Sequence, residues 1–305
     1  MTGKITQWNN LAGIVEKLDY LSELGVGSVL VNPVYPKTEG SFNADNFKDI
    51  DPVFGDLNDF DELVTGLHDR GLKLIMDFVP KLPSKNPQQI IEELKGILKF
   101  WLDKGVDGFR VDANVDMLDE LRELRLVLDE KTAEDYHPRI LMTISDLPND
   151  RIKFYGTNFT EHAGDIAHMP MNFALIEEFP DAPSVTAQKL NDTISNYVGS
   201  LKQKADPGAW PNFVLGIAEK SRVATRLGHD LVDVMNMVTM LLPGTPITYS
   251  GEEIGMKGSG DVPMQWDASA NAGFSSATPW KPVNADYEKV KYVCSIMHFW
   301  ITSPS

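Results

Sequence analysis

The feature that most constrains the fold is a repeated pairing of a short apolar run with a glycine-terminated amphipathic helix. Residues 10–24 carry apolar side chains at helical spacing, Gly25 follows them, and the run 28–31 is typical of a buried parallel strand. We expect further helices at 59–70, 87–104, 117–131, 185–204, 222–241 and 287–301, and strands at 72–78, 108–111, 140–144, near 164–167, 213–216 and 246–249. This alternation predicts βαβ crossovers and a parallel sheet, and hence an α/β protein.

The number of strands favours a closed barrel. Seven are accounted for, and an eighth would have to be 4–8 or is absent. A chain of 305 residues suits one (β/α)8 TIM-type barrel. We therefore predict a single domain over 1–305, with its first strand absent or displaced. An open doubly wound sheet is the alternative, disfavoured because no glycine-rich phosphate loop follows the first clear strand.

Charge and composition exclude several classes of partner. The net charge is −16, from 44 acidic and 28 basic residues, and lysine and arginine form no cluster. Nucleic acid and anionic lipid are poor partners for such a surface. No run approaches 18 apolar residues, so no membrane span is expected within this chain. The six histidines lack metal-ligand spacing, and neither a metal nor a cofactor is expected. Cys294 is the only cysteine; it lies in the apolar run 290–300, which indicates a buried thiol.

Three acidic residues stand where predicted strands should end. They are Asp112, Asp146 and Glu219. The carboxyl ends of barrel strands form the face on which active sites lie. Arg110 precedes Asp112 by two residues and therefore shares its strand face. The simplest interpretation is that the three acids are solvated strand-end residues or ion-pair partners of Arg110 and Arg222.

The segments around these acids resemble the α-amylase family of glycoside hydrolases. The resemblance rests on several motifs in the family's order: VNPVYP at 31–36, IDPVFG at 50–55, LIMDFVP at 74–80, GFRVD at 108–112, GTP at 244–246 with GEEIG at 251–255, and MQWD at 264–267, the last common in the α-glucosidase branch. They are spread over more than 200 of the 305 residues. The resemblance implies an amylase-type barrel.

The resemblance also implies roles for the three acids. Retaining glycosidases need a nucleophile and an acid/base carboxyl about 5–5.5 Å apart. By position, Asp112 matches the nucleophile. Asp146 matches the acid/base, where the family has Glu, and Glu219 matches a third carboxylate, where the family has Asp. Each exchange moves a carboxylate by about 1 Å, which can cost roughly 100-fold in rate.

Residues that would bind the sugar in the family are also replaced. Phe42 and Asn43 stand where the family has Tyr and Asp, and Lys81 and Leu82 stand where it has Asn and His. Ala218 occupies the position of a further His. Phe, Leu and Ala side chains donate no hydrogen bonds. The resemblance therefore implies a barrel that is not an enzyme, with no residue expected to be catalytic.

Two segments of the family are missing, and their absence points to one branch. One predicted helix fills most of the chain between Asp77 and Asp112, which leaves no room for the domain that the family inserts after its third strand. The β-domain that normally follows the barrel is missing too. The chain is similar to the heavy-chain subunits of heteromeric amino-acid transporters, in WNNLAGI at 8–14, KLDYL at 17–21 and FWL at 100–102.

This branch implies a function without catalysis. We expect the ectodomain of an ancillary heavy chain that supports surface delivery or stability of a multispanning amino-acid transporter light chain. It would lie on the extracellular face of the plasma membrane, in a single-pass type II protein whose anchor is outside this chain. Asn158 and Asn191 are candidate glycosylation sites, although about two such motifs arise by chance.

Two other functions stay open. In an active retaining α-glucosidase, Asp112 would attack, Asp146 would act as acid/base and Glu219 would assist. In a carbohydrate-binding module, the altered cleft would bind sugar, which the missing cleft wall disfavours.

Overall fold

The computed structural model describes residues 10–36, 46–78, 86–146, 151–156, 166–205 and 208–292. Its helices are α1 (Leu11–Val15), α2 (Leu18–Glu23), α3 (Leu57–Asp69), α4 (Pro87–Asp103), α5 (Leu118–Asp135), α7 (Ala174–Glu177), α8 (Ala187–Lys204), α9 (Val223–Arg226) and α10 (Val232–Leu241). Its strands are β1 (Ser28–Val31), β2 (Lys73–Phe78), β3 (Gly108–Asp112), β4 (Ile140–Ile144), β5 (Met169–Pro170), β6 (Asn212–Val214) and β7 (Thr245–Ile247).

The chain forms two compact units. The first runs from Trp8 to Met171 and includes Leu201–Ala209. The second comprises Asn172–Ser200 and the chain from Trp210 onward. The single domain over 1–305 stays a prediction, and the strand expected at 4–8 lies outside the described residues.

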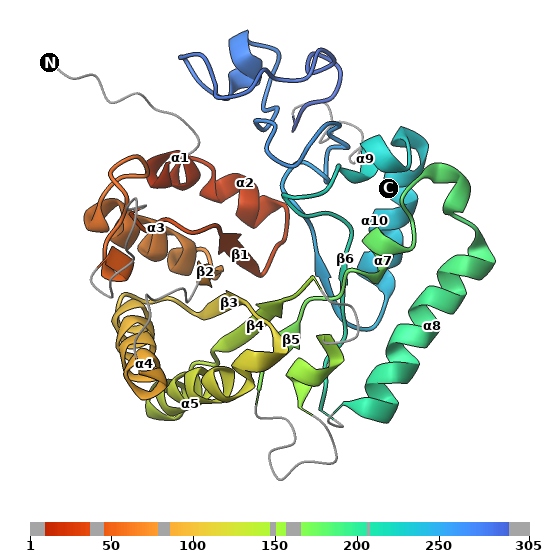
Figure 1. Cartoon of the computed structure of the whole chain (residues 1–305). Coiled ribbons are helices and arrows are strands. Elements are labelled where there is room, and N and C mark those ends of the chain that lie inside the picture. The colour runs from red at the N-terminus through yellow and green to blue at the C-terminus, as the bar shows by residue number, and fades with distance from the viewer. Residues whose placement is uncertain are drawn as a thin grey trace, which may run out of the picture. The chain divides into compact units, whose positions relative to one another are not determined.

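The first unit contains a five-stranded parallel sheet in the order β1-β2-β3-β4-β5 (Figure 1). The strands predicted at 28–31, 72–78, 108–111 and 140–144 are confirmed. The strand predicted near 164–167 pairs later, at Met169–Pro170, because Ile166 and Ala167 enter the core before the ladder with β4 begins. The register sets Asp77 opposite Arg110 and Asp112 opposite Ile144.

One face of this sheet packs against helices. Leu74, Phe78, Phe109 and Val111 are buried there with residues of α3, α4 and α5. Trp101 of α4 is fully buried, and its indole N–H donates to the Phe47 carbonyl at 2.6 Å. Side chains alternate along a strand, so the opposite face carries Ile75, Asp77, Arg110 and Asp112. Of these, Asp77 and Asp112 lie at or next to the carboxyl ends of their strands.

The second unit contains the parallel pair β6–β7, with Asn212 opposite Thr245. Its core includes Leu175, Phe179, Phe213, Leu215 and Met235. The predicted strands 213–216 and 246–249 are present but shifted by one residue and shortened, since the chain leaves the sheet at Leu215 and at Thr248.

Three predicted helices differ from the structure. The helix expected at 222–241 is interrupted at Gly228, whose φ of +84° does not continue an α-helix. The helix expected at 10–24 breaks at Lys17, which has non-helical dihedrals. Residues 287–291 form turns, so the start predicted for the last helix is wrong, and residues 293–301 lie outside the described part. Within the described ranges, no helix has the length and hydropathy required to cross a bilayer.

Candidate functional site

The carboxyl edge of the five-stranded sheet carries two of the three acids. Asp112 is the last residue of β3 and is exposed. Asp146 lies two residues beyond Ile144, the partner of Asp112, and is exposed as well. Continuing the strand alternation would place both carboxylates on one face, offset by about 7 Å along the strands. The structure thus places Asp112 at a strand end as predicted, and Asp146 just past one.

Arg110 pairs with Asp77 and not with Asp112. Its Nε donates to Asp77 Oδ1 at 2.9 Å and its Nη2 donates to Oδ2 at 2.6 Å. The parallel register explains this, because it sets the two residues opposite each other on neighbouring strands. Asp77 is buried, so this bidentate pair is more rigid than a surface ion pair. Of the two alternatives that the sequence left open for Asp112, the ion pair with Arg110 is not formed, and Asp112 is an exposed strand-end residue. The sequence did not identify Asp77 as the partner of Arg110.

Tyr35 lies in the aromatic cluster close to this pair. Its ring makes edge contacts with Phe47 and Trp101, at centroid distances of 5.3 and 5.8 Å. Burial raises the pKa of the Tyr35 phenol well above its usual range, and the negative charge of Asp77 raises it further. The phenol therefore stays neutral and cannot act as a base at physiological pH.

Glu219 belongs to the second unit and is not at a strand end. It is exposed in a turn, whereas β6 already ends at Val214. The sequence predicted a strand over 213–216 with Glu219 standing at its end. That placement is wrong, because the observed strand ends five residues before Glu219.

Arg222, the expected partner of Glu219, donates to backbone carbonyls instead. Its guanidinium bonds the carbonyl of Ser250, that of Ser259 at 3.3 Å and that of Gly260 at 3.0 Å. It also stacks on the ring of Tyr249, 5.2 Å from the centroid. Burial lowers the pKa of Arg222. This arginine fastens the loop after β7 to the turn that carries Glu219, and it does not neutralise the carboxylate.

Glu252 is a buried acid that the sequence reasoning missed. Its Oε2 accepts the Tyr249 N–H at 2.9 Å. Its Oε1 faces Gly216, where an added Cβ would lie 2.0 Å from that oxygen. Burial raises the pKa of Glu252 to about 7. The motif GEEIG marked this segment, but only packing distinguishes the buried Glu252 from its half-buried neighbour Glu253.

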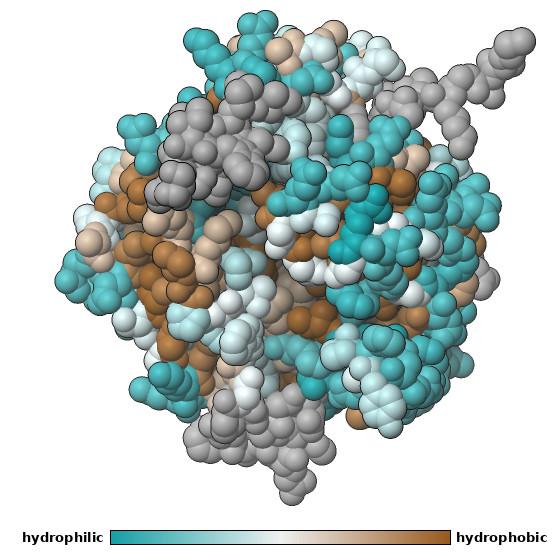
Figure 2. Space-filling model, turned by 180° about the vertical axis from the view of Figure 1, so that it is seen from behind, coloured by the Kyte–Doolittle hydropathy of each residue, from teal (hydrophilic) through white to brown (hydrophobic). Residues whose placement is uncertain are grey.

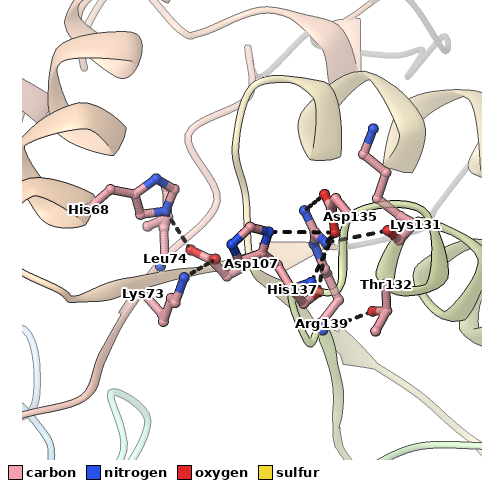
Figure 3. A network of polar contacts seen from close by, with 9 residues as sticks. All are labelled: His68, Lys73, Leu74, Asp107, Lys131, Thr132, Asp135, His137 and Arg139. Atoms are coloured by element: carbon pink, nitrogen blue, oxygen red, sulfur yellow. Dashed lines mark hydrogen bonds and ion pairs between the residues drawn. The ribbon is translucent and has the colours of Figure 1, made fainter.

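A polar network lies at the opposite, amino end of the strands (Figure 3). Asp107 accepts from His68 Nε2 at 2.8 Å, from the Leu74 N–H at 2.9 Å and from Lys73 Nζ at 3.1 Å. Polar contacts at this end of a barrel serve stability, because active sites form at the other end. We therefore assign Asp107 to the scaffold.

The polar neighbours of the three acids can be given for the described residues. No described residue forms a hydrogen bond or ion pair with the carboxylates of Asp112, Asp146 or Glu219. Catalytic carboxylates need neighbours that hold them within a fraction of an ångström of the productive position. The remaining candidates Phe42, Asn43, Lys81 and Leu82 lie outside the described residues, and Ala218 lies in the Glu219 turn.

Of the other predicted sites, one lies within the described residues and two lie outside them. Asn191 is exposed on α8, which makes it accessible for modification, whereas Asn158 and Cys294 lie outside the described residues. Among the residues that the structure describes, no cluster of three or more His, Cys, Asp or Glu has an arrangement that fits a metal ion.

Comparisons with known proteins agree with the family resemblance that the motifs indicated. The family model described as "Alpha amylase, catalytic domain" matches residues 1–88 and 79–296. The amino acid transporter heavy chain SLC3A1 of Homo sapiens is 31% identical over 399 aligned positions, covering 92% of this chain and 58% of the heavy chain. The α-glucosidase of Culex pipiens is 27% identical, covering 92% of this chain and 67% of that enzyme.

A solved structure shows the same fold. The trehalulose synthase MutB from Pseudomonas mesoacidophila MX-45 superposes with a TM-score of 0.71 at 20% identity, covering 94% of this chain and 76% of that one. The family match divides near residues 79–88, just after β2, and the alignment to the human heavy chain has more positions than the 305 residues here. Relatives therefore carry additional residues that this chain lacks.

Proposed function

The chain belongs to the α-amylase family, and from that premise we propose that it is the barrel part of a non-catalytic transporter heavy chain. In this proposal it supports the surface delivery or stability of a multispanning amino-acid transporter light chain. The higher identity to the heavy chains than to the insect glucosidase carries the proposal. The chain spans 58% of the length of those heavy chains. The partnership of a whole heavy chain with a transporter is therefore extended to this chain only as part of the proposal.

The site supports this assignment over catalysis. Asp146 stands where the family has Glu, and Glu219 stands where the family has Asp. All three acids are exposed, and none has a hydrogen-bond or ion-pair partner among the described residues. The arginines that might have held them are engaged elsewhere, Arg110 by Asp77 and Arg222 by carbonyl groups. A carboxylate that is not held in place must be oriented during the reaction, and the free energy of that orientation raises the activation barrier.

The proposal includes an extracellular location. The anchor would be a single apolar span outside this chain, as in a type II membrane protein. The exposed Asn191 on α8 would then be open to glycosylation. Treatment of the secreted or surface protein with an N-glycosidase should shift its mass, and Asn191→Gln should reduce that shift.

Activity measurement tests the absence of catalysis. We expect no turnover of aryl α-glucosides or maltose by the purified chain, under conditions in which the α-glucosidase of Culex pipiens is active. Asp146→Glu should not create activity, because one restored methylene leaves Ala218 and the unsupported Glu219 unchanged. Turnover that disappears in Asp112→Asn would contradict the proposal.

The second candidate is an active retaining α-glucosidase. The specific observation in its favour is that Asp112 and Arg110 keep the family's residue types on one strand face. In that case Asp112 would attack the anomeric carbon and Asp146 would protonate the leaving oxygen. The Asp112→Asn experiment separates the two candidates.

A further inference from the structure

Glu252 places a carboxyl group inside the second unit with a single hydrogen bond. The residue is 2% exposed, and its Oε2 accepts the Tyr249 N–H at 2.9 Å. Its Oε1 is buried and has no hydrogen-bond partner among the described residues. An ionised carboxylate offers about four acceptor sites, so one donor leaves most of them unsatisfied. The neutral acid therefore fits this position better than the carboxylate does.

The backbone at Gly216 closes the space around the second oxygen. A Cβ at this glycine would lie 2.0 Å from Glu252 Oε1 and 2.9 Å from the carboxyl carbon. The carboxyl group thus lies directly against the main chain that follows β6. A water molecule does not fit between the two, so hydration cannot support a negative charge from this side.

Two arginines lie near Glu252, and both are engaged with carbonyl groups. Arg222 binds four carbonyls between residues 250 and 262. Arg226 donates to the carbonyl of Phe179 at 2.5 Å and to that of Leu215 at 2.6 Å. Burial raises the pKa of Glu252 to about 7, although the charges of both arginines lower it. Neither guanidinium forms an ion pair with the carboxyl group in the described part of the chain.

The other titratable groups around Glu252 do not stabilise its negative charge. Glu253, on the same loop, raises the pKa of Glu252. Burial raises the pKa of the Tyr249 phenol, which therefore stays neutral at physiological pH. Asp233 is the only charged residue of α10, and β6 has none. The imidazole of His229 lies beside the far end of the loop.

The Glu252 loop, residues 249–256, lies in apolar surroundings. Ile254 and Met256 are buried on the loop itself, and Leu215 is buried just after β6. The loop contacts α10 where Asn236 Nδ2 donates to the Glu252 carbonyl at 3.5 Å. A hydrophobic area on the left of Figure 2 lies on the side where Figure 1 shows α10, since the view is turned by 180°. Ionisation would therefore place a charge among apolar groups, which costs free energy unless the loop carries that charge to solvent.

We propose that the Glu252 loop is a pH-sensitive latch, closed on Gly216 while Glu252 carries its proton and opening locally when that proton passes to solvent. Opening would also withdraw the Ser250 carbonyl from Arg222, the arginine that holds the neighbouring turn. The loop is thus held more tightly at acidic than at neutral pH. The latch rests on contacts within the second unit alone, so it is independent of the proposed function.

The direction of the pH dependence follows from the two states of the loop. In the open state Glu252 meets water and releases its proton near pH 4.5, whereas in the closed state it keeps the proton up to about pH 7. Closure is therefore most favourable below pH 4.5 and weakens as the pH rises to 7. Between pH 5 and pH 8 the equilibrium constant for opening should increase roughly 10- to 100-fold.

Hydrogen exchange of the loop amides measures this opening in the full chain. The protection of residues 249–256, relative to an unfolded peptide at the same pH, should fall roughly 10- to 100-fold from pH 5 to pH 8. At pH 8 the amides of β6 and α10 should stay better protected than those of the loop. Equal protection of all three would mean that the loop opens only when the unit unfolds. That outcome, or loop protection that does not change with pH, would refute the latch.

Two substitutions on the loop separate the charge of Glu252 from its shape. Glu252→Gln keeps an acceptor for the Tyr249 N–H and cannot ionise, so loop protection should be nearly the same at pH 5 and pH 8. Glu253→Gln is the matched control and should keep the fall in protection, because the buried acid is still present. A wild-type pH dependence in Glu252→Gln would overturn the inference.

Substitution of Gly216 tests the seat of the carboxyl group. Gly216→Ala places a methyl group against Oε1, so Glu252 should be displaced and loop protection should be low at both pH values. Gly199→Ala, in α8 of the same unit, adds a methyl group with no atom within 4 Å and should leave the pH dependence unchanged. If Gly216→Ala kept the wild-type dependence while circular dichroism showed a folded chain, the latch would be refuted. Should that variant not fold, the Glu252→Gln comparison decides.

Discussion

At the scale of single residues, His168 has an environment that disfavours its protonation. Its Nδ1 accepts the Leu141 N–H at 3.0 Å, which requires the neutral ring. Burial, together with the nearby positive charge of Arg125, lowers the pKa of His168 to about 4. The histidine therefore contributes to the β4–β5 region as a hydrogen-bond acceptor. No metal or proton-transfer role follows from its position.

This environment predicts a loss of stability in acid. The unfolded chain binds a proton at His168 below about pH 6.5, whereas the folded chain does so only near pH 4. The free energy of unfolding should therefore fall by roughly 1–3 kcal/mol as the pH drops through this window. His168→Asn keeps an acceptor near the Nδ1 position and should flatten that dependence. Urea unfolding at pH 7.5 and 5.0 checks it, and His137→Asn, at an exposed ring, should behave as the wild type.

Glu252 should have the opposite pH dependence. Burial keeps it protonated up to about pH 7, whereas the unfolded chain releases the proton near pH 4.5. Stability is therefore complete below pH 4.5 and is lost as the pH rises to 7, by roughly 1–3 kcal/mol. Glu252→Gln keeps an acceptor for the Tyr249 N–H and removes the titration.

The measurement for Glu252 is a difference between two pH values. Relative to the wild type, Glu252→Gln should be more favourable for folding at pH 8 than at pH 5. The half-buried Glu253, which accepts the Gly251 N–H at 2.8 Å, provides the control Glu253→Gln. A pH dependence shared by both variants would show that burial of Glu252 is not its cause.

At the scale of elements, two helical glycines make opposite predictions for one substitution. Gly199 in α8 has no atom within 4 Å of an added Cβ, so Gly199→Ala should stabilise the protein by about 0.5–1 kcal/mol. Gly66 in α3 is different, because its Cβ would lie 2.5 Å from Cδ1 of the buried Leu18. Gly66→Ala should destabilise by about 1–2 kcal/mol. Thermal unfolding of both variants tests the packing of α2 against α3, and equal effects would contradict it.

The first four strands of the first unit were predictable because each is a short apolar run, and the first three of these runs lie close to a glycine. The contacts of the candidate site were harder to predict from the sequence. The Arg110–Asp77 pair depends on register, which sets residues far apart in sequence opposite each other and cannot be read from one strand alone. Arg222 bonds carbonyl groups of residues 250–260, and its sequence neighbours gave no sign of that. Residue types predicted the presence of a carboxyl edge, but tertiary contacts decided which charges are paired on it.

At the scale of the whole molecule, scaffold and site should separate by mutation. Asp112 is exposed and Ile75 is buried on the same face of the same sheet. A chain that acts through its folded surface should tolerate substitution of Asp112 but not the introduction of a charge at Ile75. An unpaired charge at Ile75 would cost several kcal/mol, comparable with the 5–15 kcal/mol that holds a typical domain together.

Surface delivery of a partner measures this separation. Each variant is displayed behind a single apolar span and expressed with a multispanning amino-acid transporter that carries an extracellular tag, and tagged molecules at the cell surface are counted. Asp112→Ala should leave that number near the wild-type value, because the carboxylate has no described partner to lose. Ile75→Asp should abolish delivery, because the sheet core would not form. If Asp112→Ala removed the partner as completely while circular dichroism showed a folded chain, the acidic edge would have a role in assembly, and the surface around β3 would be the first place to look for the contact.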